Sequence, residues 1–149
     1  MTGCYYEEFE VGRTFEHEKR RTITESDNQR FCDMTMNQQP LHLDAEFAAE
    51  TEFGERIVNG LYTMSLAVGL TIPDTTDGTI VANLGYDDVE HPAPVYPGDT
   101  LRARTTVTDK RETSDGDRGV VTMHVEAYAG DDRLVCAFDR TVLAKKRPS

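Results

Sequence analysis

The sequence has no tryptophan, only three cysteines and few basic residues, since 16 Lys and Arg stand against 27 Asp and Glu for a net charge of −11. Nucleic-acid binding depends on clustered Lys and Arg that meet phosphates, so this balance argues against a nucleic-acid partner. The longest apolar block, residues 58–70, is too short to span a membrane and contains Tyr62, Thr63 and Ser65. We therefore expect no membrane association.

The three cysteines, Cys4, Cys32 and Cys136, are odd in number and share no metal-like spacing. Reduced thiols are the default for such a set in an intracellular protein, and we predict no metal site. Glutamates at residues 7, 8 and 10 interrupt any early apolar run, so no signal peptide is visible. We expect a cytoplasmic protein.

The chain of 149 residues contains no internal repeat and no low-complexity linker. A chain of this length can bury about 70% of its unfolded surface, so we expect a single domain over residues 1–149. The acidic excess is typical of a halophilic protein, in which carboxylates keep the chain hydrated, and equally of an ordinary acidic domain. Composition leaves these two alternatives open.

The first half of the chain contains short elements. Residues 14–24 show weak alternation and many charges, which predicts an edge strand. Thr24 and Asp27 have the spacing of a capping box, with Asp in place of the usual Glu or Gln, so a short helix should begin there. Its inner face is expected to carry Phe31, Cys32 and Met34. A second surface helix is predicted over residues 44–52, with Phe47 facing inward.

The second half begins with the clearest helix and continues with strands. Apolar residues cover most of the circumference of a helix over Asn59 to Thr71, so we expect it to be buried nearly all round. After Pro73 the pattern changes to period two, and it predicts strands over 79–86, 100–108, 119–129 and 134–144. Turns are expected at 97–98, 114–116 and 130–132. Helices followed by antiparallel strands describe an α+β domain in which one sheet packs on a central helix.

Three segments together resemble a known family: NQQPLHLD from Asn37 to Asp44, VNGLYT from Val58 to Thr63, and PAPVYPGDTL from Pro92 to Leu101. They are similar to the MaoC-like dehydratase family, which includes the R-specific enoyl-CoA hydratases, over about residues 8–146. The resemblance implies a hotdog fold, a curled antiparallel sheet wrapped around a central buried helix. It also implies acyl-coenzyme A thioester substrates, no cofactor beyond the coenzyme A of the substrate, and a homodimer or dimer of dimers with active sites near the dimer interface.

The family motif places an Asp two residues before an Asn, followed by Pro, any residue and His. By position, these four residues correspond to Asn37, Gln39, Pro40 and His42 in this chain. The Asp and His of the family hold and deprotonate the water that adds across the C2–C3 bond of an enoyl thioester. The resemblance therefore implies that His42 and Asn37 are catalytic positions and that Gln39 and Pro40 contact the substrate.

The Asn at position 37 departs from the family because an amide cannot accept a full proton. Its carbonyl can still orient a water, and His42, with an ordinary pKa of about 6.5, suits acid–base work near neutrality. Asp33 and Asp44 are near enough in the sequence to replace the missing carboxylate, but the motif does not point to either of them. The alternative for His42 is an imidazole that pins the loop through backbone hydrogen bonds.

The helix start at Asn59 and Gly60 suggests a second role. The first turn of a helix has unpaired N–H groups and a partial positive charge. At Gly60 a thioester carbonyl can approach the backbone without meeting a Cβ, and the N–H would stabilise the enolate. The alternative is that Asn59 is an ordinary N-cap and Gly60 a close packing contact. We therefore count both residues as substrate-binding candidates.

We consequently expect a hydratase or dehydratase of acyl-CoA thioesters, with His42 as the main acid–base group. A non-catalytic acyl-CoA-binding or regulatory protein is the first rival, because the family carboxylate is replaced at Asn37. A thioesterase of the same fold is the second, and the PLH motif argues against it.

Overall fold

The computed structural model describes all residues from 1 to 149. The helical elements are η1 (Tyr6–Glu8), α1 (Glu25–Met34), α2 (Pro40–Leu43), α3 (Ala45–Ala49) and α4 (Gly60–Thr75). The strands are β1 (Thr14–Glu16), β2 (Arg21–Thr22), β3 (Ile80–Glu90), β4 (Thr100–Glu112), β5 (Arg118–Ala129) and β6 (Arg133–Lys145). None of the helices is long and apolar enough to cross a membrane.

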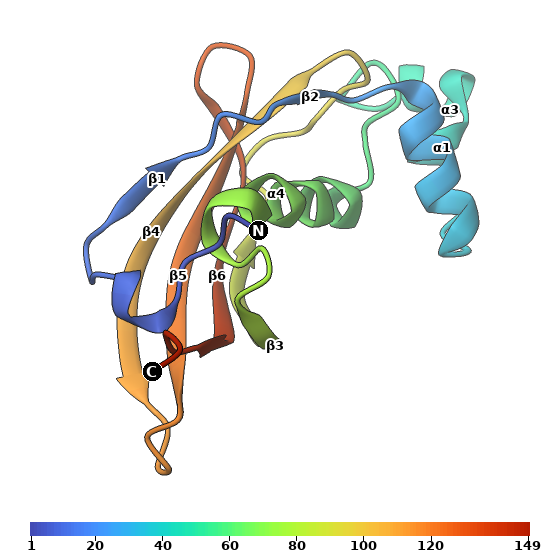
Figure 1. Cartoon of the computed structure of the whole chain (residues 1–149). Coiled ribbons are helices and arrows are strands. Elements are labelled where there is room, and N and C mark those ends of the chain that lie inside the picture. The colour runs from blue at the N-terminus through green and yellow to red at the C-terminus, as the bar shows by residue number, and fades with distance from the viewer.

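The six strands form one antiparallel sheet in the order β1-β4-β5-β6-β3, and β2 also pairs with β4. Figure 1 shows the sheet curving around α4, with α1 and α3 grouped beyond one end of that helix. This confirms the predicted α+β architecture of a curled sheet around a central helix. The predicted edge strand is present in two pieces, β1 and β2, separated by residues 17–20.

The main core lies between α4 and the inner face of the sheet. Alternate residues of β4 and β5 point inward, as the period-two pattern predicts, and Leu101 and Val125 are fully buried there with Phe138 of β6. Ala67 and Leu70 of α4 pack against them. A smaller cluster beneath η1 and β1 fills the other end of the sheet.

The α4 helix differs from its prediction in burial and length. Its buried residues follow one stripe, Thr63, Ala67, Leu70, Thr71 and Thr75, because the sheet covers only one side of the helix. Leu61 is 59% exposed, so the prediction of burial nearly all round is wrong. The helix also continues past Pro73 to Thr75, whose hydroxyl donates to the Thr71 carbonyl in the last turn.

Two further predictions of inward-facing side chains are wrong. Met34 at the end of α1 is 76% exposed, because α1 presents Cys32 and Asn28 to the interior instead. Phe47 is half-exposed, since the short α3 buries Ala48.

The N-terminus of α1 and the turn before β4 are confirmed. Thr24 and Asp27 form the reciprocal capping box, with Asp27 N–H donating to the Thr24 hydroxyl and Thr24 N–H donating to the Asp27 carboxylate. Before β4, Asp99 N–H donates to the Tyr96 carbonyl, and Gly98 adopts a φ of +99°. A positive φ at this position is what a type II turn requires.

Candidate active site

His42 lies in α2, a single helical turn that begins at Pro40. Its Nδ1 is 2.8 Å from the carbonyl oxygen of Ile57. A carbonyl only accepts hydrogen bonds, so Nδ1 carries a proton and donates it to Ile57. The other ring nitrogen, Nε2, has no partner in the protein and remains the atom that can exchange a proton.

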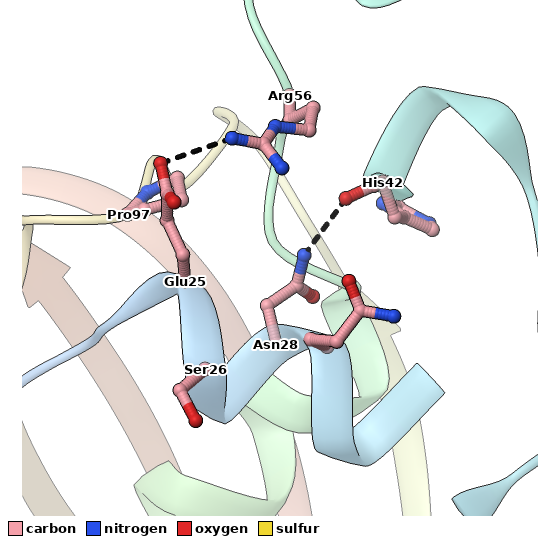
Figure 2. Close-up of a pocket in the computed structure, with 7 residues that line it drawn as sticks. Glu25, Ser26, Asn28, His42, Arg56 and Pro97 are labelled. Atoms are coloured by element: carbon pink, nitrogen blue, oxygen red, sulfur yellow. Dashed lines mark hydrogen bonds and ion pairs between the residues drawn. The ribbon is translucent and has the colours of Figure 1, made fainter. Parts of the chain in front are cut away.

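Two cavities adjoin His42. One, of about 340 Å³, has no hydrophobic side chain in its lining, which is Glu25, Ser26, Asn28, Gln29, His42, Arg56 and Pro97 (Figure 2). The other, of about 360 Å³, is lined by His42, Phe53, Ile57, Val58, Gly60, Thr63, His91, Pro92, Ala93, Pro94, Val95 and Val135. We name them the polar cavity and the apolar cavity.

The backbone of His42 faces one cavity and its ring the other. Its carbonyl oxygen accepts from Asn28, which lines only the polar cavity, and Figure 2 shows the imidazole pointing away from Asn28. The ring is hydrogen-bonded to Ile57, which lines only the apolar cavity. His42 and the partner of its ring, Ile57, thus both line the apolar cavity.

Gly60, the first residue of α4, also lines the apolar cavity. The side chain of Asn59 caps this helix by accepting from Leu61 N–H over 2.9 Å. The Gly60 N–H makes no hydrogen bond within the protein, as the first N–H groups of a helix commonly do not. His42 and an unused backbone donor thus open onto the same space.

A buried network fixes the two elements relative to each other. Asn28 Nδ2 donates to the His42 carbonyl over 3.1 Å, and Asn28 Oδ1 accepts from Asn59 N–H over 2.9 Å. The thiol of Cys32 also donates to Asn28 Oδ1, and Asn59 Nδ2 donates to the sulfur. Burial raises the pKa of the Cys32 thiol against the opposing effect of the Asn59 hydrogen bond, so it stays a protonated donor. This network joins α1, α2 and α4.

The other predicted positions lie outside both cavities. Asn37 is half-buried, and its Oδ1 accepts from Gln39 N–H over 3.3 Å in the turn before α2. Gln39 and Pro40 are exposed, and none of the three lines either cavity. Asp44, offered as a substitute base, instead caps α3 by accepting from Glu46 and Phe47 N–H.

The sequence prediction missed Asn28 and His91. Asn28 had one signal: it lies one helical turn before Cys32, on the face that α1 buries. His91 follows β3 and had no signal beyond the prolines after it.

No group of three or more His, Cys, Asp or Glu side chains is arranged to hold a metal ion. All three cysteines are free and buried.

Comparison with known proteins adds a family to this geometry. The family model described as "MaoC like domain" matches residues 8–129. A β-methylmalyl-CoA dehydratase from Chloroflexus aurantiacus is 33% identical over 145 residues, which is 97% of this chain and 41% of the relative. The chain thus spans about two fifths of the length of that curated relative.

Two solved structures share the architecture. One, from Archaeoglobus and described as a monoamine oxidase regulatory protein, has a TM-score of 0.88 and 32% identity, covering 99% of this chain and 98% of the other. The second, from Mycobacterium tuberculosis and described as having a double hotdog fold, has a TM-score of 0.88 and 24% identity. It covers 99% of this chain, which in turn covers 46% of it. The fold predicted from the sequence is thereby confirmed as a hotdog.

Proposed function

Because this chain belongs to the MaoC-like domain family, we propose that it reversibly adds water across the C2–C3 double bond of an acyl-coenzyme A thioester. One observation carries the proposal: His42, whose Nε2 has no partner in the protein, and Gly60, whose N–H is unpaired, line the same apolar cavity. The relative from Chloroflexus aurantiacus, a β-methylmalyl-CoA dehydratase, supports the substrate class.

In the hydration direction, His42 Nε2 takes a proton from water as the water oxygen bonds to C3. Electron density moves to the thioester carbonyl, and an enolate develops there. The Gly60 N–H donates to that oxygen, and such a preorganised donor typically contributes about 10²–10³ in rate. The enolate then takes up a proton at C2. The donation from Nδ1 to Ile57 holds the ring in the tautomer that this step requires.

Asn37 and Gln39 have a supporting role in this proposal. The hydrogen bond from Gln39 N–H to Asn37 shapes the turn that delivers Pro40 to the first position of α2. Proline is favoured at that position because its missing N–H would be unpaired there anyway. The turn therefore sets where α2, the one-turn helix that carries His42, begins.

The first test is turnover of a panel of enoyl- and 3-hydroxyacyl-CoA thioesters, including branched and dicarboxylic ones, at low and high salt. We expect hydration or dehydration of at least one of them. The variant His42→Ala should lower kcat by about 10²–10⁴. His124→Ala is the matched control, because His124 pairs with Asp139 on the sheet and lines neither cavity.

Two rivals give different results in the same assay. The Archaeoglobus neighbour is described as a regulatory protein, which favours a binding module as the second candidate. Saturable binding of every thioester tried without turnover would identify such a module. Release of free coenzyme A thiol would identify a thioesterase.

We also propose that two copies associate through β3. This edge strand pairs only with β6 and exposes Val81, Leu84, Tyr86 and Val89. Unpaired edges with apolar side chains favour pairing with another strand. The double hotdog neighbour, of which this chain covers 46%, supports a second copy as the partner.

Sedimentation or light scattering would test this association. Leu84→Lys should shift the protein toward monomer, because it places a charge on the exposed edge. Val11→Lys, at a residue of similar exposure in the turn before β1, should not. A wild-type protein that is monomeric at micromolar concentration would contradict the proposal.

A further inference from the structure

The apolar cavity contains only two side chains that can gain or lose a proton near neutral pH. Its lining is otherwise formed by aliphatic residues, one phenylalanine, prolines, one threonine and Gly60. The two are His42 and His91, and no carboxylate or basic side chain lines the cavity with them. The position of the family carboxylate, Asn37, lies outside it.

His91 lines this cavity and is restrained by its neighbours along the chain. It follows the end of β3 and precedes Pro92, so its backbone is restrained on one side by the strand and on the other by the proline ring. Its imidazole lies against Gly60: a Cβ built on Gly60 would be 3.0–3.2 Å from Cε1, Nδ1 and Nε2 of His91. The three distances are nearly equal, so the face of the ring near Cε1 packs on the first turn of α4.

The absence of a side chain at Gly60 is what allows this contact. The same residue presents the N–H that we assign to the thioester carbonyl, and C2 is the carbon next to that carbonyl. His91 consequently lies at the carbonyl end of the bound thioester. It is exposed and makes no hydrogen bond within the protein, so solvent can reach its ring.

Hydration needs a base that takes a proton from water and an acid that gives a proton to C2. His42 can fill only one of these two roles at a time. We propose that His91 is the second acid–base residue of the site, an inference that rests on the proposed hydratase function. In the dehydration direction, neutral His91 removes the C2 proton while the His42 imidazolium gives its Nε2 proton to the leaving hydroxyl. The C–O bond breaks, the C2–C3 double bond forms and water leaves. Solvent then removes the proton from His91 and returns one to His42.

The test compares His91→Ala and His91→Gln with wild type and with His124→Ala, in the dehydration of the best 3-hydroxyacyl-CoA found in the panel. Both His91 variants should lower kcat by about 10²–10⁴ with a smaller change in KM. The limb of the pH profile in which the rate rises as the base loses its proton should disappear. Added imidazole should restore turnover in His91→Ala, where it can occupy the space that the ring leaves, and not in His91→Gln.

Three other outcomes would overturn the inference, and each points to a different cause. If His91→Gln keeps the wild-type rate and both limbs, a side chain that cannot titrate suffices and His91 only packs on Gly60. If wild type turns over and His42→Ala abolishes it while His91→Ala does not, the hydratase function stands and the second acid–base group is not His91. If wild type turns over no thioester, the proposed function fails and the role of His91 falls with it.

Discussion

The side-chain amide of Asn28 donates to the backbone carbonyl of His42 over 3.1 Å, although fourteen residues separate the two along the chain. The same amide accepts from Asn59 N–H at the start of α4. One buried side chain thus sets the distance between the turn that carries the imidazole and the helix end that carries the free N–H of Gly60. The geometry of the apolar cavity depends on a residue that does not line it.

Replacing Asn28 by Asp should therefore impair catalysis. The carboxylate can still accept from Asn59 N–H but cannot donate to the His42 carbonyl, which it would repel. We expect a fall in kcat, and a loss of about 1–3 kcal/mol in the free energy of unfolding from the buried carbonyl left unpaired. Steady-state kinetics and denaturant unfolding measure the two effects. Ser26→Asp, which adds the same charge to α1 at an exposed position, is the control. A wild-type kcat in Asn28→Asp would show that the link does not matter.

Two glycines of α4 should respond differently to alanine. Alanine is favoured over glycine in a helix by about 0.5–1 kcal/mol. A Cβ on Gly69 meets nothing within 4 Å, so Gly69→Ala should raise the melting temperature and leave turnover unchanged. A Cβ on Gly60 meets the His91 ring, so Gly60→Ala should displace that ring and lower kcat. Equal kcat values for the two variants would contradict the assigned contact.

The capping box of α1 should make stability depend on acid pH. Burial opposes ionisation of Asp27, but hydrogen bonds from Thr24 N–H and Arg21 outweigh it and hold the pKa of the Asp27 carboxyl below its ordinary value. A lowered folded-state pKa stabilises the protein above the unfolded pKa of about 3.9, and this contribution is lost as pH falls through the folded value.

The free energy of unfolding of wild type should consequently exceed that of Asp27→Asn at neutral pH, and the difference should shrink below about pH 4. Urea unfolding at a series of pH values measures it. Asp115→Asn, at an exposed turn where Asp115 makes no side-chain hydrogen bond, should show no such difference. A gap between wild type and Asp27→Asn that is constant down to pH 2 would refute the assignment.

Asn37→Asp tests whether the family position is a dormant catalytic site. The Asp side chain can still accept from Gln39 N–H, so the turn should be kept. Because Asn37 lines neither cavity, we expect kcat and its pH profile to stay close to those of wild type. A large gain in hydration would instead show that a carboxylate at position 37 reaches the reacting water.

The features predicted most securely from the sequence are those encoded by neighbouring residues. Three local features were confirmed: the Thr24–Asp27 box, the Tyr96–Asp99 turn and the alternation in β4 and β5. Each depends on hydrogen bonds or side-chain directions among residues that are close together in the sequence. Predictions of inward-facing residues failed at Met34 and Phe47. The faces that short helices bury depend on what packs against them, and no local pattern records that.

By itself, the sequence determined the hotdog family, the strand pattern and His42 as the candidate group, because motif and periodicity are properties of the linear chain. Only the tertiary structure decided what surrounds that imidazole. It places Asn37 outside the apolar cavity, ties His42 to Asn59 through Asn28, and brings His91 against Gly60 from 31 positions further along the chain. The reason is physical: proton transfer depends on distances of a few ångströms, and those distances are set by packing between segments that the sequence separates.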